Sequence, residues 1–342
     1  MKTIPKDVFA RFADLCGKGA KELAFFSGGQ DWSDGTLFRY EAEGRPMVLK
    51  ILGMPTKEGE GLARATDRVR FVRYFGERGC PIVLPEPFGD GNPFALECDG
   101  DATYIAYRYR FVPGRTVEKG DKSPYTGNFY RAAGELLGSL HAAWEDRPEA
   151  LTPEGGSDSS GALRGWRGEM ASFREWGRDE DVGRAWDRLR DELEKLPVDK
   201  AGYGFTHNDA HAFNMVFDPE AEPGRSGGEP SLTLIDFDVA NFHWFMNDSA
   251  VALYSFGIMA SGGVEAEKGP PEGFLEFAYG AFWDGYRRRR DPGAFWLERL
   301  ALFLQYRRCL MFVPFQAETE KHPAWKASWK SRILAEDKRL FG

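Results

Sequence analysis

The chain has 342 residues, enough for one large or two ordinary domains with a sizeable hydrophobic core. Hydrophobic residues make up 42% and charged residues 29%, which is typical of globular proteins and excludes a fibrous or largely disordered chain. The formal net charge of −8 argues against binding to nucleic acid or to an anionic membrane through counterion release. The composition therefore favours a globular enzyme.

Four scattered cysteines form no C-x-x-C pair, so neither a disulfide framework nor a zinc site is expected. Charges interrupt the first fifteen residues, and no run of 18 apolar residues occurs, so we expect neither a signal peptide nor a membrane span. These features predict a cytoplasmic protein. Nothing in the sequence predicts its oligomeric state.

The first third of the chain mixes helical and strand-like patterns. Apolar residues at helical spacing predict a helix over 7–24, and the runs 36–42 and 46–52 predict two antiparallel strands joined by a turn. A second helix is predicted over 60–78, where Gly79 ends it, and a further strand over 102–111. This part of the chain is therefore predicted to be an α+β lobe.

The rest of the chain is predicted to be mainly helical. Apolar stripes predict helices over 129–144 and around 163–173, and the pattern from 246 onward is mostly helical. The fold class expected from these elements is α+β in two lobes. We place the smaller, antiparallel-sheet lobe at 1–110 and the larger helical lobe at 111–342.

The densest polar cluster of the sequence lies in YGFTHNDAHAFNMVFD, residues 203–218. His207, Asp209 and Asn214 fit the pattern H-x-D-x-x-x-x-N, the spacing of the catalytic loop in protein kinases and their relatives. Phosphoryl transfer needs a carboxylate that orients the attacking hydroxyl and accepts its proton. Asp209 is the predicted base.

A short hairpin is predicted next to this loop. The apolar runs 214–218 and 232–238 can pair, which would place Asn214 and Asp236 near the same end of two neighbouring strands. Amide and carboxylate oxygens are ligands that Mg²⁺ prefers. We therefore predict that Asn214 and Asp236 bind a magnesium ion beside the phosphates of a nucleotide.

H-x-D-x-x-x-x-N followed by Asp236-Phe237-Asp238 resembles the aminoglycoside phosphotransferase and choline kinase group of protein-kinase-like small-molecule kinases, over about residues 25–315. The resemblance implies a bilobal protein-kinase-like fold, ATP between the lobes, and a small-molecule hydroxyl acceptor held by the helical lobe. It implies that Asp209 is the base and that His207 supports the catalytic loop. Asn214 and Asp236 would bind Mg²⁺, and Asp238, which replaces the glycine of D-F-G, would bind or position it.

In the N-terminal lobe, Lys50 of PMVLKIL resembles the strand lysine that contacts the α- and β-phosphates. The acidic helix residue that should pair with this lysine departs from the family pattern, and either Asp67 or Glu60 is expected to serve. The family also places the adenine against backbone groups of the strand that ends near Tyr109 and Phe111.

The strict Gly-rich loop G-x-G-x-x-G is missing. Gly28, Gly29 and Gly35 are expected to let backbone N–H groups approach the phosphates as a looser version of that loop. No Walker A motif is present in the sequence, which disfavours a P-loop kinase.

The expected function is ATP- and Mg²⁺-dependent phosphoryl transfer to a hydroxyl of an aminoglycoside, an amino alcohol or a homoserine-like molecule. Three alternatives stay open. The first is a protein Ser/Thr kinase of the same fold, and the second is a nucleotide-binding module without catalysis. The third is a metallohydrolase built on His207, Asp209, His211 and Asp236.

Overall fold

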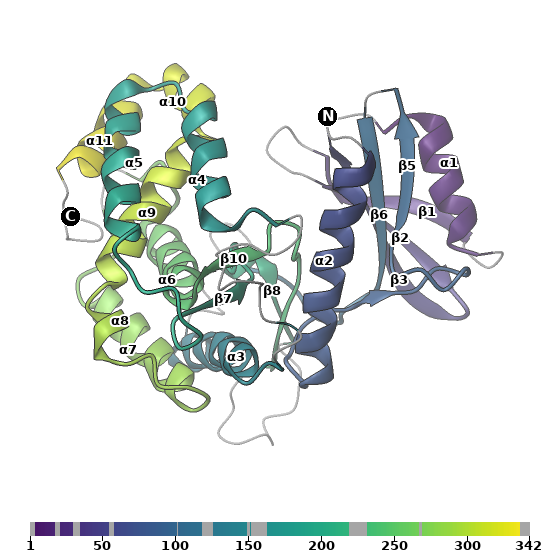
Figure 1. The fold of residues 1–342 in the computed structure, drawn as a ribbon, viewed down its shortest axis with the longest axis horizontal. Helices are drawn as coiled ribbons and strands as arrows, with labels where there is room; N and C mark the ends of the chain where they lie inside the picture. Colours follow the sequence, from purple (N-terminus) through teal and green to yellow (C-terminus); the bar gives the residue numbers. More distant parts are fainter. Residues whose placement is uncertain are drawn as a thin grey trace. The chain divides into compact units, whose positions relative to one another are not determined.

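The structure is a computed structural model that describes residues 4–17, 21–29, 35–54, 58–100, 102–117, 126–148, 151, 163–218, 231–266 and 269–335. It divides into two compact units (Figure 1). The first comprises Met1–Glu77 and Ile82–Pro113, and the second comprises Arg78–Pro81 and Gly114–Gly342.

The first unit is built on an antiparallel sheet with strand order β1-β2-β3-β6-β4, and β5 also pairs with β6. The strands are β1 (Lys21–Gly28), β2 (Gly35–Ala42), β3 (Arg45–Met54), β4 (Pro85–Glu86), β5 (Ala95–Asp99) and β6 (Ala102–Arg110). The helices are α1 (Lys6–Leu15) and α2 (Glu58–Glu77). The predicted strands over 36–42, 46–52 and 102–111 and the predicted helix over 60–78 are confirmed by β2, β3, β6 and α2.

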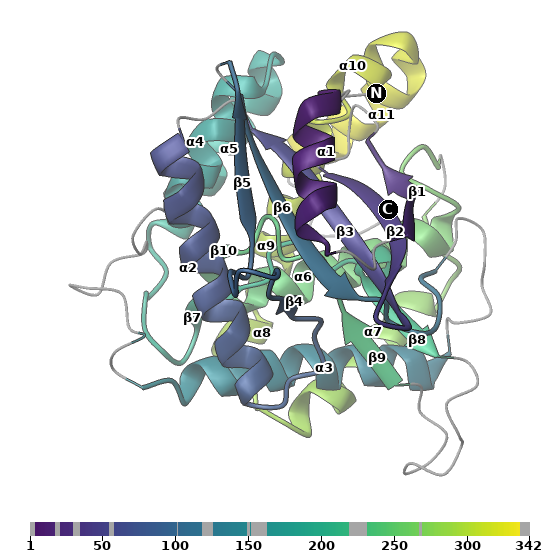
Figure 2. The same cartoon turned by 90° about the vertical axis from the view of Figure 1, so that its right-hand side faces the viewer.

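Two apolar clusters in the first unit use alternate residues of β3. Leu49 and Ile51 pack with Val8 and Phe12 of α1, whereas Leu52 packs with Ala65 and Val69 of α2. Because side chains alternate along a strand, α1 and α2 cover opposite faces of the sheet (Figure 2). Lys50, two residues from Leu52, lies on the face that α2 covers.

The predicted helix over 7–24 is wrong beyond its first half. The helix α1 ends at Leu15, and the strand β1 begins at Lys21. Gly17 has a φ of 100°, a left-handed conformation that glycine adopts readily and that commonly ends a helix. The apolar residues of α1 continued in step with those of β1, so periodicity alone did not reveal the break.

The second unit is mainly helical. Its helices are α3 (Gly127–Glu145), α4 (Gly165–Trp176), α5 (Glu180–Leu193), α6 (Phe245–Ser261), α7 (Phe274–Arg287), α8 (Ala294–Leu297), α9 (Leu300–Phe312), α10 (Gln316–Lys321) and α11 (Pro323–Leu334). The predicted helices over 129–144 and around 163–173 are confirmed as α3 and α4. No helix in the described ranges combines the length and the apolar character needed to cross a membrane.

Two short antiparallel pairs complete the second unit. The strand β7 (Tyr203–Thr206) pairs with β10 (Asn241–Trp244), and β8 (Met215–Asp218) pairs with β9 (Ser231–Leu234). A single turn of 3₁₀ helix, η3 (Ala212–Asn214), precedes β8. The predicted hairpin is confirmed by the β8–β9 pair, whereas the β7–β10 pair was not predicted.

The helices α3 and α7 approach closely because of glycine. A Cβ atom on Gly134 would collide with the carbonyl oxygen of Phe282, and one on Gly285 would collide with the carbonyl oxygen of Arg131. Between these two helices and α9 runs α6, whose residues from Phe245 through Tyr254 are all buried. A helix that is apolar on nearly every side forms the centre of this unit.

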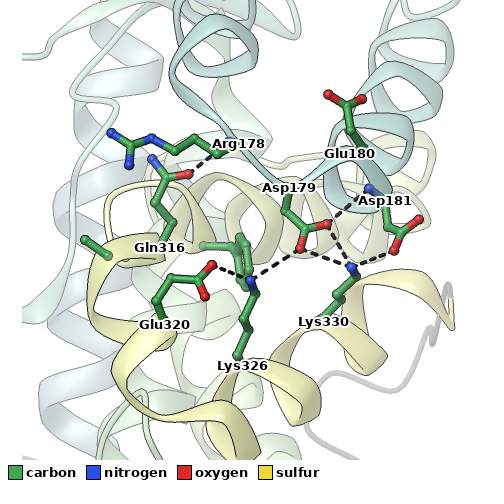
Figure 3. Close-up of a pocket in the computed structure, with 10 residues that line it drawn as sticks. Arg178, Asp179, Glu180, Asp181, Gln316, Glu320, Lys326 and Lys330 are labelled. Carbon is green, nitrogen blue, oxygen red and sulfur yellow. Dashed lines mark hydrogen bonds and ion pairs between the residues drawn. The ribbon is translucent and has the colours of Figure 1, made fainter.

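A cavity of about 510 Å³ lies between the start of α5 and the helices α10 and α11 (Figure 3). Five of the charged side chains that line it, Asp179, Asp181, Glu320, Lys326 and Lys330, pair with one another. Asp179 accepts hydrogen bonds from the backbone N–H groups of Asp181 and Val182 and so caps α5. The Lys330 Nζ lies 2.9 Å from Asp179 Oδ1 and 2.5 Å from Asp181 Oδ2, and Lys326 pairs with Glu320. This arrangement is a structural ion network that joins α5 to α11.

Asp179→Ala is expected to lower the free energy of unfolding by about 1–2 kcal/mol, the usual effect of losing a helix cap. Asp179→Asn keeps the helix cap but removes the negative charge, so it measures the contribution of the charge alone. Burial raises the pKa of Asp179, but Lys330 and the capped Val182 N–H outweigh burial and lower it. A carboxyl with a lowered pKa stabilises the folded state above its unfolded value of about 3.9, and this contribution disappears as the pH falls below that value.

Urea denaturation at pH 7 and at pH 3 tests this predicted pH dependence of the stability. Wild type should exceed Asp179→Asn in stability at pH 7, and the difference should shrink at pH 3. Glu180→Gln, on the exposed neighbouring carboxyl, is the control. A difference that does not change with pH would contradict the assigned role of the charge.

Candidate active site

The loop after β7 is fixed by a buried histidine. The ring of His207 is fully buried. Its Nε2–H donates to the carbonyl oxygen of Ile235 at 2.8 Å, and its Nδ1 accepts from the backbone N–H of Asp209 at 3.3 Å. The bond accepted at Nδ1 requires the neutral ring, and burial lowers the pKa of His207 accordingly. The imidazole therefore links the β8–β9 hairpin to the loop.

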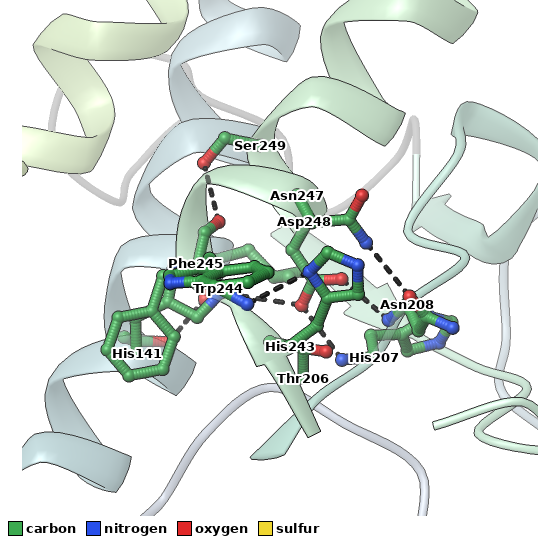
Figure 4. A network of polar contacts seen from close by, with 12 residues as sticks. His141, Thr206, His207, Asn208, His243, Trp244, Phe245, Asn247, Asp248 and Ser249 are labelled. Atoms are coloured by element: carbon green, nitrogen blue, oxygen red, sulfur yellow. Dashed lines mark hydrogen bonds and ion pairs between the residues drawn. The ribbon is translucent and has the colours of Figure 1, made fainter. Parts of the chain in front are cut away.

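A buried carboxylate of α6 holds the same loop from its other side (Figure 4). Asp248 accepts hydrogen bonds from the backbone N–H groups of His207 at 2.8 Å and Asn208 at 2.6 Å. The His141 Nε2 lies 3.4 Å from Asp248 Oδ2, and the Tyr286 hydroxyl lies 2.8 Å from His141 Nδ1. Burial opposes ionisation of Asp248, but His141 and the loop N–H groups outweigh burial and lower its pKa.

Asp248→Ala is expected to lower the free energy of unfolding by about 3–5 kcal/mol, because it leaves several buried donors without an acceptor. Turnover should fall as well, since the loop loses two of its anchors. Urea denaturation and steady-state kinetics measure the two effects. Ser249→Ala, a buried change on the same helix, is the control and should change stability by less than about 1 kcal/mol. Equal effects of the two variants would exclude Asp248 as the anchor.

The loop residue Asn208 adopts a left-handed conformation with φ of 67°. Its side chain donates to Glu169 of α4 and accepts from Asn247 Nδ2 at 2.8 Å. The Tyr306 hydroxyl of α9 donates to the other oxygen of Glu169 at 2.5 Å. Burial raises the pKa of Glu169 despite these two donors. Both α4 and α9 are thereby connected to the loop.

Asp209, the predicted base, is fixed through its backbone and its side chain. Its carbonyl oxygen accepts from Asn214 Nδ2 at 2.9 Å. The Arg307 Nη2 of α9 donates to Asp209 Oδ1 at 2.6 Å, and His211 Nε2 lies 3.2 Å from Oδ2. Burial opposes ionisation, but His211 and Arg307 outweigh it and hold the pKa of Asp209 well below its ordinary value. With 29% of its side chain exposed, this carboxylate is charged and accessible.

The predicted metal ligands follow the loop on the β8–β9 hairpin. Met215 pairs with Leu234, and the N–H of Ile235 donates to the carbonyl oxygen of Asn214 at 3.0 Å. Asn214 and Asp236 therefore flank the same end of the two strands. Because Asn214 Nδ2 donates to Asp209, its Oδ1 is the atom that remains for a cation. The N–H of Asp238 lies 3.4 Å from Asp236 Oδ1, so the two carboxylates lie on one turn.

This donor set suits a hard divalent cation, because it consists of one amide oxygen and carboxylate oxygens. Within the described ranges, no group of three or more His, Cys, Asp or Glu side chains is arranged to hold a metal ion. Both ring nitrogens of His207 are engaged by backbone groups. The metallohydrolase alternative therefore loses His207, one of its two histidines.

In the first unit, the predicted phosphate-contacting lysine is buried in the sheet. Lys50 is 5% exposed. In the register of the sheet it lies opposite Leu37 of β2 on one side and Tyr107 of β6 on the other. Asp67 belongs to α2, the helix that covers the same face of the sheet. Glu60 lies in the first turns of α2, and its side chain is outside the described part of the structure. The strand lysine and the helix with its candidate partners thus meet on one face.

Two glycines lie at the end of β1, where the connection to β2 begins. Gly28 and Gly29 have φ values of 83° and 69°, and the Gly29 N–H donates to the Gly35 carbonyl oxygen at 2.9 Å. A Cβ on Gly28 would collide with that same carbonyl oxygen. The predicted loop between these glycines and Gly35 lies at 30–34, outside the described residues.

The two aromatic residues expected near the adenine lie at the end of β6. Tyr109 stacks on Tyr107 with ring centroids 6.2 Å apart. Phe111 contacts Phe26 edge to face, lies under the guanidinium of Arg39, and donates its N–H to the carbonyl oxygen of Pro46. Both rings are partly exposed at the boundary of the first unit.

Sequence reasoning missed the partners that the loop finds in distant helices, Glu169, Asp248 and Arg307. It also missed His141 and Tyr306, which bond to Asp248 and Glu169. A signal existed for two of them. Asp248 and Arg307 are charged residues inside the apolar helical segments FMNDSAVALYSF and LALFLQYRRCLMF. A charge at such a position is buried and must find a partner.

Comparison with known proteins places the loop in a wider context. The model of the Phosphotransferase enzyme family matches residues 23–292. The amicoumacin kinase of Bacillus subtilis (strain 168) is 21% identical over 311 residues, which cover 90% of this chain and 83% of that protein.

Two solved structures resemble the fold throughout. Amicoumacin kinase hAmiN, in complex with AMP-PNP, Ca²⁺ and Ami, has a TM-score of 0.75 at 20% identity, covering 98% of this chain and 94% of that one. A microcompartment-associated aminopropanol kinase has a TM-score of 0.71 at 16% identity, covering 98% of this chain and 100% of that one.

Proposed function

Because this chain belongs to the phosphotransferase enzyme family, we propose that it transfers the γ-phosphoryl group of ATP to a hydroxyl group of a small molecule. The observation that carries the proposal is the Asp209 carboxylate. It is ionised, partly exposed and fixed on a loop whose backbone is anchored by His207 and Asp248.

Asp209 suits the role of a base that orients its substrate. Its lowered pKa makes it a weak proton acceptor. In the loose transition state of phosphoryl transfer the attacking hydroxyl needs orientation more than early deprotonation. A carboxylate with fixed oxygens can accept the hydroxyl hydrogen bond and receive the proton as the new P–O bond forms.

We further propose that the oxygens of Asn214, Asp236 and Asp238 hold Mg²⁺. Such an ion would neutralise charge on the phosphates when bound. The amicoumacin kinase hAmiN structure, which contains AMP-PNP and Ca²⁺, supports ATP with a divalent cation. In the first unit, Lys50 is proposed to contact the phosphates and Asp67 to pair with it, with Gly28 and Gly29 near the phosphates and Tyr109 and Phe111 near the adenine.

The proposed acceptor is a small molecule with a hydroxyl group and an amine, because the similar proteins are kinases of amicoumacin and aminopropanol. The proposed location is the cytoplasm. The free thiols of Cys16, Cys80, Cys98 and Cys309 support a reducing compartment.

An ATP-consumption screen tests the function. Purified protein is incubated with ATP, Mg²⁺ and one acceptor at a time: aminoglycosides, amino alcohols, amicoumacin, homoserine and a generic protein substrate. ATP consumption that depends on one small acceptor is the expected result. Consumption with the protein substrate alone would favour a protein kinase, and nucleotide binding without consumption would favour the inactive module.

A further inference from the structure

The side chain of Arg307 reaches the proposed base from a part of the chain almost a hundred residues away. It projects from α9, is 8% exposed, and donates from Nη2 to Asp209 Oδ1 at 2.6 Å. A charge-assisted bond of this length to a carboxylate is among the stronger interactions in proteins. Neither the sequence motif nor its spacing assigns a role to this arginine.

The helix α9 is a rigid support for the guanidinium. The neighbouring Tyr306 stacks on Trp186 with centroids 5.2 Å apart, and its hydroxyl bonds to Glu169 at 2.5 Å. The residues on either side are also held: Gln305 Nε2 donates to the carbonyl oxygen of Ile333 at 2.8 Å, and Arg308 donates to Gln305 at 2.9 Å. Arg307 is therefore presented from a fixed position.

The carboxylate of Asp209 lies close to the proposed metal ligand Asn214. His211 Nε2 is 3.2 Å from Asp209 Oδ2 and 3.5 Å from Asn214 Nδ2, so one ring atom separates the two side chains. A divalent cation, if held by Asn214, would attract a nearby carboxylate, and this attraction would be strong even at the dielectric of a protein surface. An aspartate that bound the metal would lose the orientation required of a base.

We propose that Arg307 is a positioning residue for phosphoryl transfer: it holds Asp209 Oδ1 against α9, so that the carboxylate faces the acceptor hydroxyl instead of joining the metal ligands. The proposal rests on the proposed function, because it assigns Asp209 as the base and Asn214 as a metal ligand. In this role the guanidinium acts through Asp209.

Three variants separate positioning from structural support. Arg307→Gln removes the charge, Arg307→Lys keeps it without the planar donor fork, and Arg308→Lys is a matched control on the same helix with similar burial, 4% exposed. The first readout is the kinetic split. Arg307→Gln should lower kcat by about 10²-fold, the effect of a small misplacement of a reacting group, with KM for ATP unchanged. Arg307→Lys should recover part of the loss.

The second readout does not need turnover. Electron paramagnetic resonance titration measures the affinity for Mn²⁺ in the presence of ATP, and Arg307→Gln should bind Mn²⁺ several-fold more tightly than wild type, because Asp209 becomes an additional ligand. Unchanged Mn²⁺ affinity, or equal losses of kcat in Arg307→Gln and Arg308→Lys, would overturn the proposal. Wild type that binds Mn²⁺ and ATP but phosphorylates no acceptor would overturn the proposed function, while the Mn²⁺ comparison would still decide whether Arg307 keeps Asp209 away from the metal.

Discussion

The Asp209→Asn variant is expected to lose about 10²- to 10⁴-fold in kcat while it still binds nucleotide, because an amide cannot accept the proton of the acceptor hydroxyl. The structure makes this substitution a clean test. The Asn oxygen can still accept from Arg307, and the amide has the same shape as the carboxylate beside His211, so the side chain should keep its place.

Steady-state kinetics with the acceptor found by the screen, together with calorimetric titration of ATP and Mg²⁺, measures the two quantities. Asp199→Asn serves as the control, because this carboxylate lies on the turn before β7 and caps Ala201, which Asn can also do. Turnover of Asp209→Asn equal to that of wild type would remove Asp209 from the role of base.

Unlike Asp209→Asn, the Asp236→Asn variant is expected to lose nucleotide binding, with at least about a tenfold loss of metal-dependent ATP affinity. A carboxylate in contact with a cation contributes several kcal/mol even at the effective dielectric of a protein surface. Asn is preferable to Ala here, because Asp236 has a φ of 70° and Asn tolerates the left-handed conformation better than Ala.

Calorimetric titration of ATP at increasing Mg²⁺ concentrations measures this effect. Excess Mg²⁺ should partly restore the affinity of Asp236→Asn. Asp209→Asn is the matched comparison, since it should retain metal-dependent binding while losing turnover. Wild-type affinity in Asp236→Asn at limiting Mg²⁺ would show that the cation is held elsewhere.

The sequence predicted those features that depend on local patterns. The α+β class, the strands β2, β3 and β6, and the helices α2 and α3 follow from periodicity within each segment. The β8–β9 hairpin follows from two apolar runs at short separation. The resemblance to the aminoglycoside phosphotransferase and choline kinase group, drawn from the loop motif, is confirmed by the family match.

Pairing across longer stretches of chain was not predictable in the same way. The strands β7 and β10 have four residues each and are separated by the loop and the hairpin. Their sequences, YGFT and NFHW, show no strict alternation because most of their residues are buried. Strands this short carry too little pattern to set a partner or a register.

The site shows the same limit. The loop motif identified His207, Asp209 and Asn214, and the structure brings these three into direct contact. The anchors that contact the loop come from α4, α6 and α9 and lie 39, 41 and 98 residues away in sequence. Only the fold reveals that Arg307 and Asp248 meet the loop, although an isolated charge in an apolar helix already signals that a partner exists.

The two peptide N–H groups that donate to Asp248 belong to the first residues after β7, while the carboxylate itself lies in the buried first half of α6. Opening of the loop after β7 would expose this anion and the imidazole of His207 together. Local opening of the loop therefore has a high free energy, because it is coupled to opening of the helical core. We therefore expect the movements that admit acceptor or release product to arise in other parts of the chain.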